Sequence, residues 1–154
     1  MTLPERARWQ RALDWIPSTR LGADFFAYTL YHVDRPLLRL SNGRLSIPAL
    51  ISGLPVVSLT TTGAKSGQQH TTPLLGIPDG ENIVLIASYY GRPRHPAWYY
   101  NVRANPRVHL ALPGRAGWYM AEEASGAERE RYWQQAVALY SGFAAYRRLA
   151  GART

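Results

Sequence analysis

Short runs of β-branched and apolar residues, separated by turns rich in glycine and proline, occupy the middle of this 154-residue chain. The runs lie at 56–62, 71–77, 83–88, 107–112 and 117–122. Gly63 to Gly67, Pro78 to Gly80 and Pro113 to Gly114 separate successive runs, and these residues favour tight turns because they preset or permit the required backbone angles. We therefore expect several short antiparallel strands, with the apolar run 83–88 as a central one.

Helical patterns flank these strands. Residues 1–40 are typical of helices with apolar faces, interrupted at Pro17 and again at Asp34 to Pro36. One helix is expected among the strands near 96–104, and Ser125 is a candidate N-cap for a helical segment over 125–149. This order lacks the β–α alternation of a doubly wound sheet. It favours a single α+β domain over 1–154, a small closed or half-closed barrel with its strands in 54–122 and helices packed against it.

The composition excludes several kinds of chemistry. Because the chain has no Cys, it cannot use a catalytic thiolate, a thiolate metal site or a disulfide framework. Its four His form neither an i, i+4 pair nor an HExxH pattern, so no metal site is expected. The N-terminus has no apolar signal core and no stretch is long enough to span a bilayer, so we expect a cytoplasmic protein.

Positive charge is concentrated in the strand region. The net charge of the chain is +8, and residues 41–121 contribute +5 of it, with seven cations against two acids. Such a field attracts anions, including phosphates, nucleic acid and anionic membranes. The aromatic strand typical of nucleic-acid binders is missing, so no nucleic-acid partner is expected. Residues 3–40 could make peripheral contact with a membrane near lipid quinones, although an apolar helix face packs on its own core by default.

A glycine-flanked turn, Gly63-Ala-Lys-Ser-Gly67, follows the first strand. Its Lys65 is the single lysine among eighteen cations. Backbone N–H groups in such a turn can form an anion-binding nest, and the lysine adds a full charge. The turn is not a P-loop, because Ala64 and Leu59 stand where that motif requires glycine. The alternative is an ordinary hairpin turn with a solvated lysine.

A second candidate segment begins where the third run ends at Ser88. A loop with Arg92 and Arg94 follows, and a helix is expected from Pro96. A helix N-terminus favours an anion or an electron-rich ring edge, and Trp98 and Tyr99 could stack on a flat ligand. The alternative is that the tryptophan belongs to the core and both arginines are solvated.

Four motifs occur in order along the chain: Leu59 to Gly67, Thr72 to Leu75, Ile86 to Ser88, and His95 to Asn101 with its continuation to Val108. In sequence and spacing they closely resemble the deazaflavin-dependent nitroreductase family, over about residues 45–148. The resemblance implies a split β-barrel related to FMN-binding barrels, coenzyme F420 as the cofactor, and hydride transfer to quinones, nitroaromatics or activated alkenes. Such a cofactor carries the redox chemistry itself, so the protein needs only to bind, orient and exclude water.

The resemblance also implies roles for individual residues. The cofactor's phosphate and glutamyl tail would meet Lys65 and Ser66. The ring would be lined by Thr72, Pro73, Leu74, Leu75, Ile86, Ala87 and Ser88, with Ala97, Trp98 and Asn101 on the opposite wall. Tyr140, Phe143 and Tyr146 would face the substrate, and hydroxyls of Ser88, Tyr140 or Tyr146 would serve as catalytic groups that orient or protonate the product.

The sequence departs from the family pattern at several of these positions. Ala64, His70 and Tyr89 stand at cofactor-binding positions where the nitroreductase type has cations, so Arg92 and Arg94 would have to compensate. Phe143 replaces a tyrosine that could donate a proton, which favours quinones over nitroaromatics as acceptors. Two alternatives follow from these departures: an FMN-binding oxidoreductase of the same fold, and a cofactor-binding or membrane-peripheral protein without catalysis. Barrels of this type often pair, so a homodimer is also expected.

Overall fold

A computed structural model describes residues 35–41, 53, 55–140 and 142–151. In chain order its elements are α3 (Arg35–Leu40), β1 (Val56–Thr62), β2 (Gln69–Asp79), β3 (Asn82–Leu85), the 3-10 helix η3 (Tyr89–Gly91), α5 (Ala97–Ala104), β4 (Arg107–Leu112), β5 (Arg115–Met120), α6 (Gly126–Leu139) and α7 (Gly142–Ala150). Within this described part, no helix has the length and apolar composition needed to cross a membrane.

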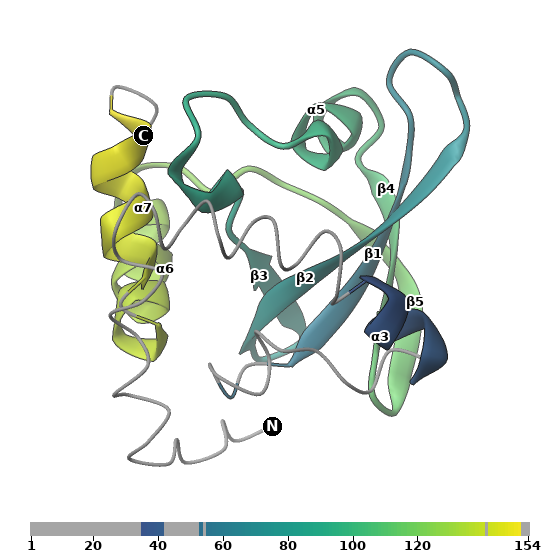
Figure 1. Cartoon of the computed structure of the whole chain (residues 1–154), viewed down its shortest axis with the longest axis horizontal. Coiled ribbons are helices and arrows are strands. Elements are labelled where there is room, and N and C mark those ends of the chain that lie inside the picture. Colours follow the sequence, from purple (N-terminus) through teal and green to yellow (C-terminus); the bar gives the residue numbers. More distant parts are fainter. Residues whose placement is uncertain (1–34, 42–52, 54, 141, 152–154) are drawn as a thin grey trace.

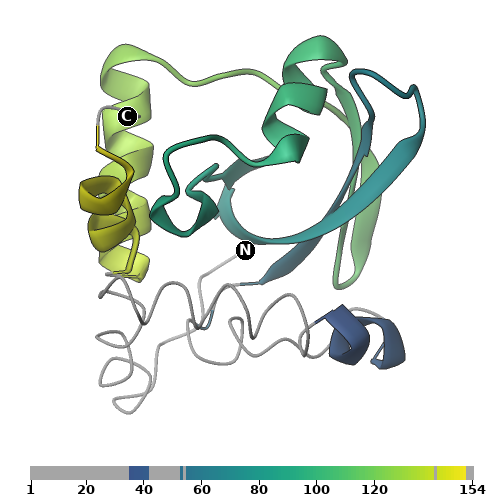
Figure 2. The same ribbon diagram turned by 45° about the horizontal axis from the view of Figure 1, so that its top comes forward.

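The strands form one five-stranded antiparallel sheet in the order β3-β2-β1-β4-β5, which curls into a half-barrel (Figures 1 and 2). The long strand β2 pairs with β1 through its first half and with β3 through its second half. Between the two halves lies Gly76, where any Cβ would collide with the side chain of Val57. The glycine therefore lets β2 bend closely over β1, and the bend gives the sheet its curl.

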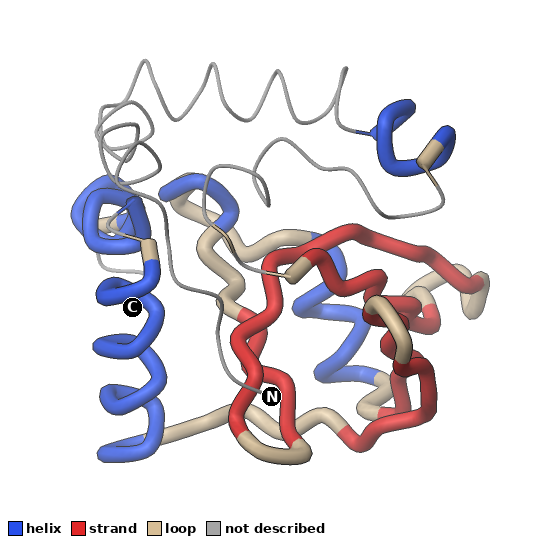
Figure 3. Tube along the Cα trace, turned by 90° about the horizontal axis from the view of Figure 1, so that it is seen from below, coloured by secondary structure: helices blue, strands red, loops and turns tan. Residues whose placement is uncertain are grey.

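Two apolar clusters hold the fold together. The first joins the sheet to α5: Val57, Leu59, Val108 and Leu110 are buried, with Trp98 and Val102 packed against them. The second joins the C-terminal helices to the end of β2, and consists of Ile77, Ala136, Tyr140, Phe143 and Tyr146. Figure 3 shows α5 beside the curled strands and α6 standing on the other side, so the two clusters mark two separate packing regions.

The structure confirms the α+β class and the antiparallel barrel strands, and the runs 56–62 and 107–112 form strands with the expected bounds. The expectation for 83–88 is wrong in one respect, because β3 is an edge strand and ends at Leu85. Its side chains are apolar because both clusters cover them, Ile83 and Leu85 from one side and Val84 from the other. Because β3 is covered on both sides, its sequence is as apolar as that of a strand in the centre of a sheet.

The helices agree with expectation in part. Helix α3 begins at Arg35 and Pro36 lies in its first turn, where a proline is tolerated because the first N–H groups of a helix have no partner within it. The segment 125–149 contains two helices, with Tyr140 in an extended conformation after α6. Ser125 occupies the N-cap position, but its side chain makes no capping hydrogen bond. The expectations for residues 1–34 lie outside the described residues.

Candidate functional site

A cavity of about 880 Å³ lies between the sheet, α5 and the C-terminal helices. Five of the residues expected at the site contribute to its wall: Ile86, Ala87, Ser88, Trp98 and Tyr146. They come from three places in the chain, namely the segment after β3, helix α5 and helix α7. The volume is within the usual range for a pocket that buries a small molecule.

The lining of this cavity offers apolar and aromatic surface to a flat ring system, together with charges of both signs. Apolar and aromatic side chains, including Trp98, Val102 and Tyr119, supply surfaces on which a planar ring can pack. Arg103, Arg129 and Arg147 also line the cavity, so cations are available near the ring. Glutamates lie in the same wall, at 122, 123, 128 and 130, and restrict where an anionic group can bind.

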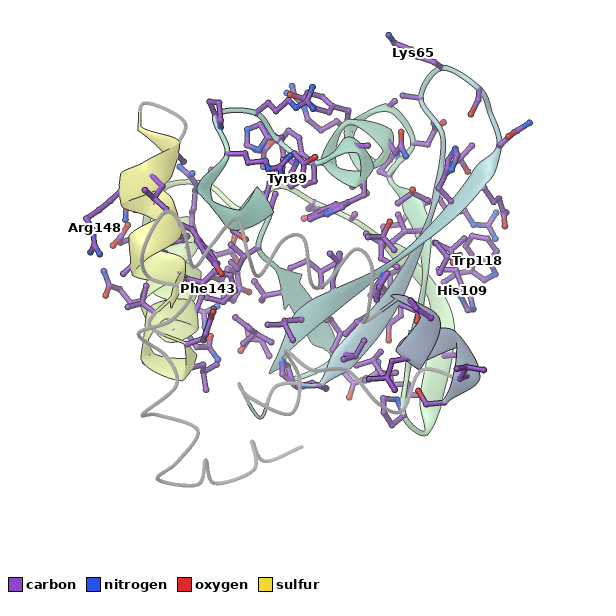
Figure 4. The ribbon with its side chains drawn as sticks, in the orientation of Figure 1. Lys65, Tyr89, His109, Trp118, Phe143 and Arg148 are labelled. Atoms are coloured by element: carbon purple, nitrogen blue, oxygen red, sulfur yellow. The ribbon has the colours of Figure 1, made fainter. Side chains whose placement is uncertain are left out.

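The expected tail-binding residues lie apart from the cavity wall. Ala64, Lys65 and Ser66 are exposed in the loop that joins β1 to β2, and Lys65 projects outward from the tip of this loop (Figure 4). The four expected ring residues of β2 do not share one face, since the register with β1 is regular and successive side chains alternate. Leu74 packs into the first cluster with Val57, so Thr72 shares its face, whereas Pro73 and Leu75 face the other way.

The predicted nest of free amides in this loop is largely wrong, because four of its N–H groups already have partners. Gly63 N–H donates to Gln68 O (2.7 Å) and Gly67 N–H to Gly63 O (2.9 Å). Gln68 N–H donates to Ser66 Oγ (3.3 Å), and Ala64 N–H to Oδ1 of Asn101 (3.0 Å). The loop is thus internally bonded, so an anion would meet its side chains, Lys65 above all.

Tyr89 adopts a left-handed conformation with φ 46°, which is costly for a residue with a Cβ and is typical of functional sites. The guanidinium of Arg92 lies 5.2 Å from the centre of the Tyr89 ring. Although tyrosine replaces the family's cation at this position, an arginine on the same loop therefore supplies a positive charge next to it.

The three residues expected at the substrate wall are buried together. Tyr140, Phe143 and Tyr146 are 4%, 5% and 4% exposed, with each ring in contact with the other two. The hydroxyls of Tyr140 and Tyr146 lie 3.3 Å apart. Of the three, Tyr146 lines the cavity. Burial raises the pKa of Tyr146 to about 12, against a smaller lowering by the bond to Tyr140, so its hydroxyl stays protonated at neutral pH.

The structure adds contacts and residues to the site. Tyr99, which the sequence offered as a residue that could stack on a flat ligand, lines the cavity, and its hydroxyl donates to Glu123 Oε1 over 2.7 Å. Burial, and then this hydrogen bond, raise the pKa of Tyr99. Tyr119 of β5 and Trp133 of α6 also line the cavity. Spacing along the chain could not have found them, because β5 and α6 approach the site only through the curl of the sheet and the following connection.

Comparisons with known proteins show the family of the chain. The family model of the F420H(2)-dependent quinone reductases matches residues 33–152. An F420H(2)-dependent quinone reductase of Mycobacterium tuberculosis is 42% identical over 96 residues, which cover 56% of this chain and 62% of the relative. The chain thus spans less than two thirds of that relative.

Two solved structures are similar to this chain in sequence and fold. The structure of an F420-H2 dependent reductase is 39% identical, with a TM-score of 0.59, and the match covers 63% of this chain and 86% of that one. A second structure, described as a domain-swapped dimer, is 33% identical with a TM-score of 0.59, and the match covers 79% of this chain and 89% of that one.

Proposed function

The chain belongs to the F420H2-dependent quinone reductase family, and from this we propose that it is an oxidoreductase that transfers a hydride from F420H2 to a quinone. The family membership gives F420 as the cofactor and confirms the resemblance seen in the sequence. The observation that carries the proposal is that Ile86, Ser88, Trp98 and Tyr146 line one and the same cavity, since three of them are expected at the cofactor ring and one at the substrate wall.

When bound, F420H2 would supply a hydride and a proton, and a quinone would take up both to become a quinol. The protein's own residues would bind and orient the two partners and exclude water. Trp98 and the residues after β3 would hold the ring, because they offer flat or apolar surface on two sides of the cavity. Apolar walls also strengthen any hydrogen bond made inside them.

Negative charge develops on the quinone oxygen as the hydride arrives, and a hydroxyl that donates to this oxygen lowers the barrier. Tyr146 is suited to this role, because it lines the cavity and holds its proton with a pKa of about 12. Ser88 lines the same cavity and is a second candidate donor. Tyr140 would act through its contact with Tyr146, whose hydroxyl lies 3.3 Å from its own.

The acceptor class rests on the family. Phe143 does not line the cavity, so it supplies no proton to an acceptor. We place quinones first, because the matching family model and a similar mycobacterial enzyme are described as F420H2-dependent quinone reductases, and nitroaromatics or activated alkenes second. We also propose a homodimer, since one similar structure is described as a domain-swapped dimer. A cytoplasmic location and a membrane contact through 3–40 remain predictions from the sequence.

Matched tryptophan variants test this function. Trp98→Phe keeps an aromatic ring at the cavity, whereas Trp98→Ala removes it, so F420 affinity should fall little in the first and by roughly tenfold in the second. Trp118→Ala is the control, because Trp118 lies on the outer side of the sheet beside His109, 57% exposed (Figure 4). Its F420 affinity and its quinone reduction should equal those of the wild type.

The measurements are calorimetric binding of F420 and of FMN, and the rate of F420H2 oxidation with a soluble naphthoquinone. Tight FMN binding without F420 binding would establish the alternative cofactor. F420 binding without oxidation by any quinone or nitroaromatic would establish the non-catalytic alternative. Equal losses in the Trp98 and Trp118 alanine variants would show that the cavity is not the cofactor site.

A further inference from the structure

The side chain of Asn101 in α5 bonds to β1 and to the tip of the β1–β2 hairpin, and it reaches β2 through Thr61. Its Oδ1 accepts from Ala64 N–H (3.0 Å), and its Nδ2 donates to Thr61 Oγ1 (3.2 Å). The Thr61 hydroxyl, 1% exposed, donates in turn to the carbonyl oxygen of His70 (3.4 Å). Both halves of one amide are therefore used, and they connect the end of β1, the loop and the start of β2.

Helix α5 presents a second asparagine to the same hairpin. Asn105 lies four residues, about one turn, beyond Asn101, and its Nδ2 donates to Thr62 O over 3.4 Å. Trp98 and Val102 of the same helix pack instead on the first cluster beside the cavity. One helix thus holds the loop with one set of side chains and lines the cavity with another.

The loop needs such support to place Lys65. Lysine carries its charge on a long flexible stem, and its binding energy is reduced by whatever backbone and side-chain freedom is lost on contact. A hairpin tip held at Ala64, directly before Lys65, loses less freedom when an anion binds. Because the Ala64 N–H already donates to Asn101, the tail of a ligand meets the lysine side chain rather than this amide.

We infer that Asn101 is a positioning residue that fixes the Gly63–Gly67 loop, and through it the Lys65 ammonium, for the anionic tail of F420. The resemblance to the family predicted that Asn101 closes the wall around the ring, whereas its hydrogen bonds lead to the loop. The inference rests on the proposed function for the identity of the ligand, but the anchoring of the loop can be measured without any ligand.

The first experiment compares F420 with its riboflavin-like fragment that lacks the phosphate and glutamates. Binding of both is measured for the wild type, Asn101→Ala, Lys65→Ala and the double variant. Each single substitution should weaken F420 binding by about tenfold at low salt, the size expected when a charge-assisted hydrogen bond is lost. Binding of the fragment should stay within about twofold of the wild type, since it has no tail to reach the loop. In the double variant, the loss should equal that of Lys65→Ala alone.

Asn105→Ala is the matched control on the same helix. Its single long bond to Thr62 O does not reach the loop tip, so F420 binding should change little. Asn101→Asp provides a variant of the same size. A carboxylate can still accept from Ala64 N–H but cannot donate to Thr61, and its charge opposes an anionic tail, so F420 binding should fall at least as much as in the alanine variant.

The second experiment measures amide hydrogen exchange in the ligand-free protein. Replacing Asn101 by Ala should speed exchange at Ala64 by about tenfold or more, while the amide of Leu59 in the centre of β1 exchanges as in the wild type. Lys65→Ala should leave the exchange of Ala64 unchanged. The exchange rate can be measured even if the protein does not bind F420. A failure of the proposed function can therefore be distinguished from a failure of the inference that Asn101 anchors the loop.

Three outcomes would overturn the inference. If Asn101→Ala weakens the fragment as much as F420, Asn101 contacts the ring as the family resemblance implied. If the losses of F420 binding free energy in Asn101→Ala and Lys65→Ala add in full in the double variant, Asn101 does not act through Lys65. If Ala64 exchanges at the wild-type rate in the Asn101 variant, the loop is not held by this amide.

Discussion

The phenol oxygen of Tyr99 lies 2.7 Å from a carboxylate oxygen of Glu123, so α5 is hydrogen-bonded to the connection between β5 and α6. Both residues line the cavity, and this bond closes part of its edge. The connection carries the two C-terminal helices, so the bond helps to hold them over the site.

The Tyr99–Glu123 bond predicts a change in alkaline stability. Burial and the bond raise the pKa of Tyr99 above its ordinary value of 10.0, so the neutral phenol is favoured in the folded state. Its contribution to stability is present below pH 10 and is lost as the pH rises through the raised pKa. Tyr99→Phe should therefore lower Tm at neutral pH, with a difference from wild type that shrinks above pH 10. Tyr100→Phe, at the exposed neighbour, should follow the wild type throughout, and a constant difference for Tyr99→Phe would contradict the assignment.

The close packing around Gly91 predicts that adding one methyl group there, in Gly91→Ala, lowers the free energy of unfolding substantially. Its φ is +75°, and a Cβ there would lie 2.7 Å from Leu149 Cβ and 3.0 Å from Tyr146 O, so η3 would be pushed away from α7. We expect Gly91→Ala to destabilise the protein by about 2–4 kcal/mol in denaturant unfolding, from strain and overpacking together. Gly114→Ala is the control, since Gly114 has φ +77° but an empty surrounding, and it should cost only about 1–2 kcal/mol. Equal costs at the two positions would show that η3 and α7 are not tightly packed.

The burial of Tyr146 predicts that its phenol ionises at a higher pH than an exposed phenol does. Its pKa is raised to about 12 by burial, so ultraviolet titration should include a phenol that ionises near that pH, and Tyr146→Phe should remove this contribution. The stabilising contribution of the neutral hydroxyl is present below pH 10 and is lost towards pH 12. The same variant should lower kcat for quinone reduction by about 10²-fold with little change in F420 affinity, if the hydroxyl donates to the reduced oxygen. Unchanged kcat would leave Ser88 as the donor.

The burial of Phe143 predicts that the substitution Phe143→Tyr lowers the stability of the protein and does not raise its activity with nitroaromatics. The ring of Phe143 is 5% exposed and lies 5.5 Å from Tyr140 and 6.3 Å from Trp133, centre to centre. A hydroxyl added by Phe143→Tyr would be buried, and it should destabilise the protein by about 1–3 kcal/mol unless a neighbour accepts its hydrogen bond. Nitroaromatic turnover should not rise, because Phe143 does not line the cavity. A clear rise, with Tm unchanged, would return Phe143 to the substrate wall.

Local patterns in the sequence were sufficient for most of the fold. The runs 56–62 and 107–112 become strands with the same bounds because alternation and turn residues act locally. The place of β3 at the sheet edge could not be predicted, since its apolar side chains result from helices that are far away in sequence. The break after α6 was missed although Ser141-Gly142 marks it in the sequence.

The site was predictable to the extent that it depends on short motifs. Ile86 to Ser88 and Trp98 belong to motifs of the chain and do meet at one cavity. The bonded amides of the loop were not predictable, because the partner of Ala64 lies 37 residues away, on a helix whose packing decides the contact. The same applies to Glu123, which reaches Tyr99 only through the path of the chain after β5.

Asn101 joins helix α5 to the loop that carries Lys65, and Trp98 of the same helix lines the cavity. We therefore expect binding at the loop and binding in the cavity to depend on each other energetically. Two fragments of one ligand, a bare ring and a free phosphorylated tail, should then bind with mutual cooperativity, each raising the other's affinity by the same factor as thermodynamic reciprocity requires. Such cooperation would let the enzyme recognise the whole cofactor more strongly than the separate affinities of its two parts would suggest.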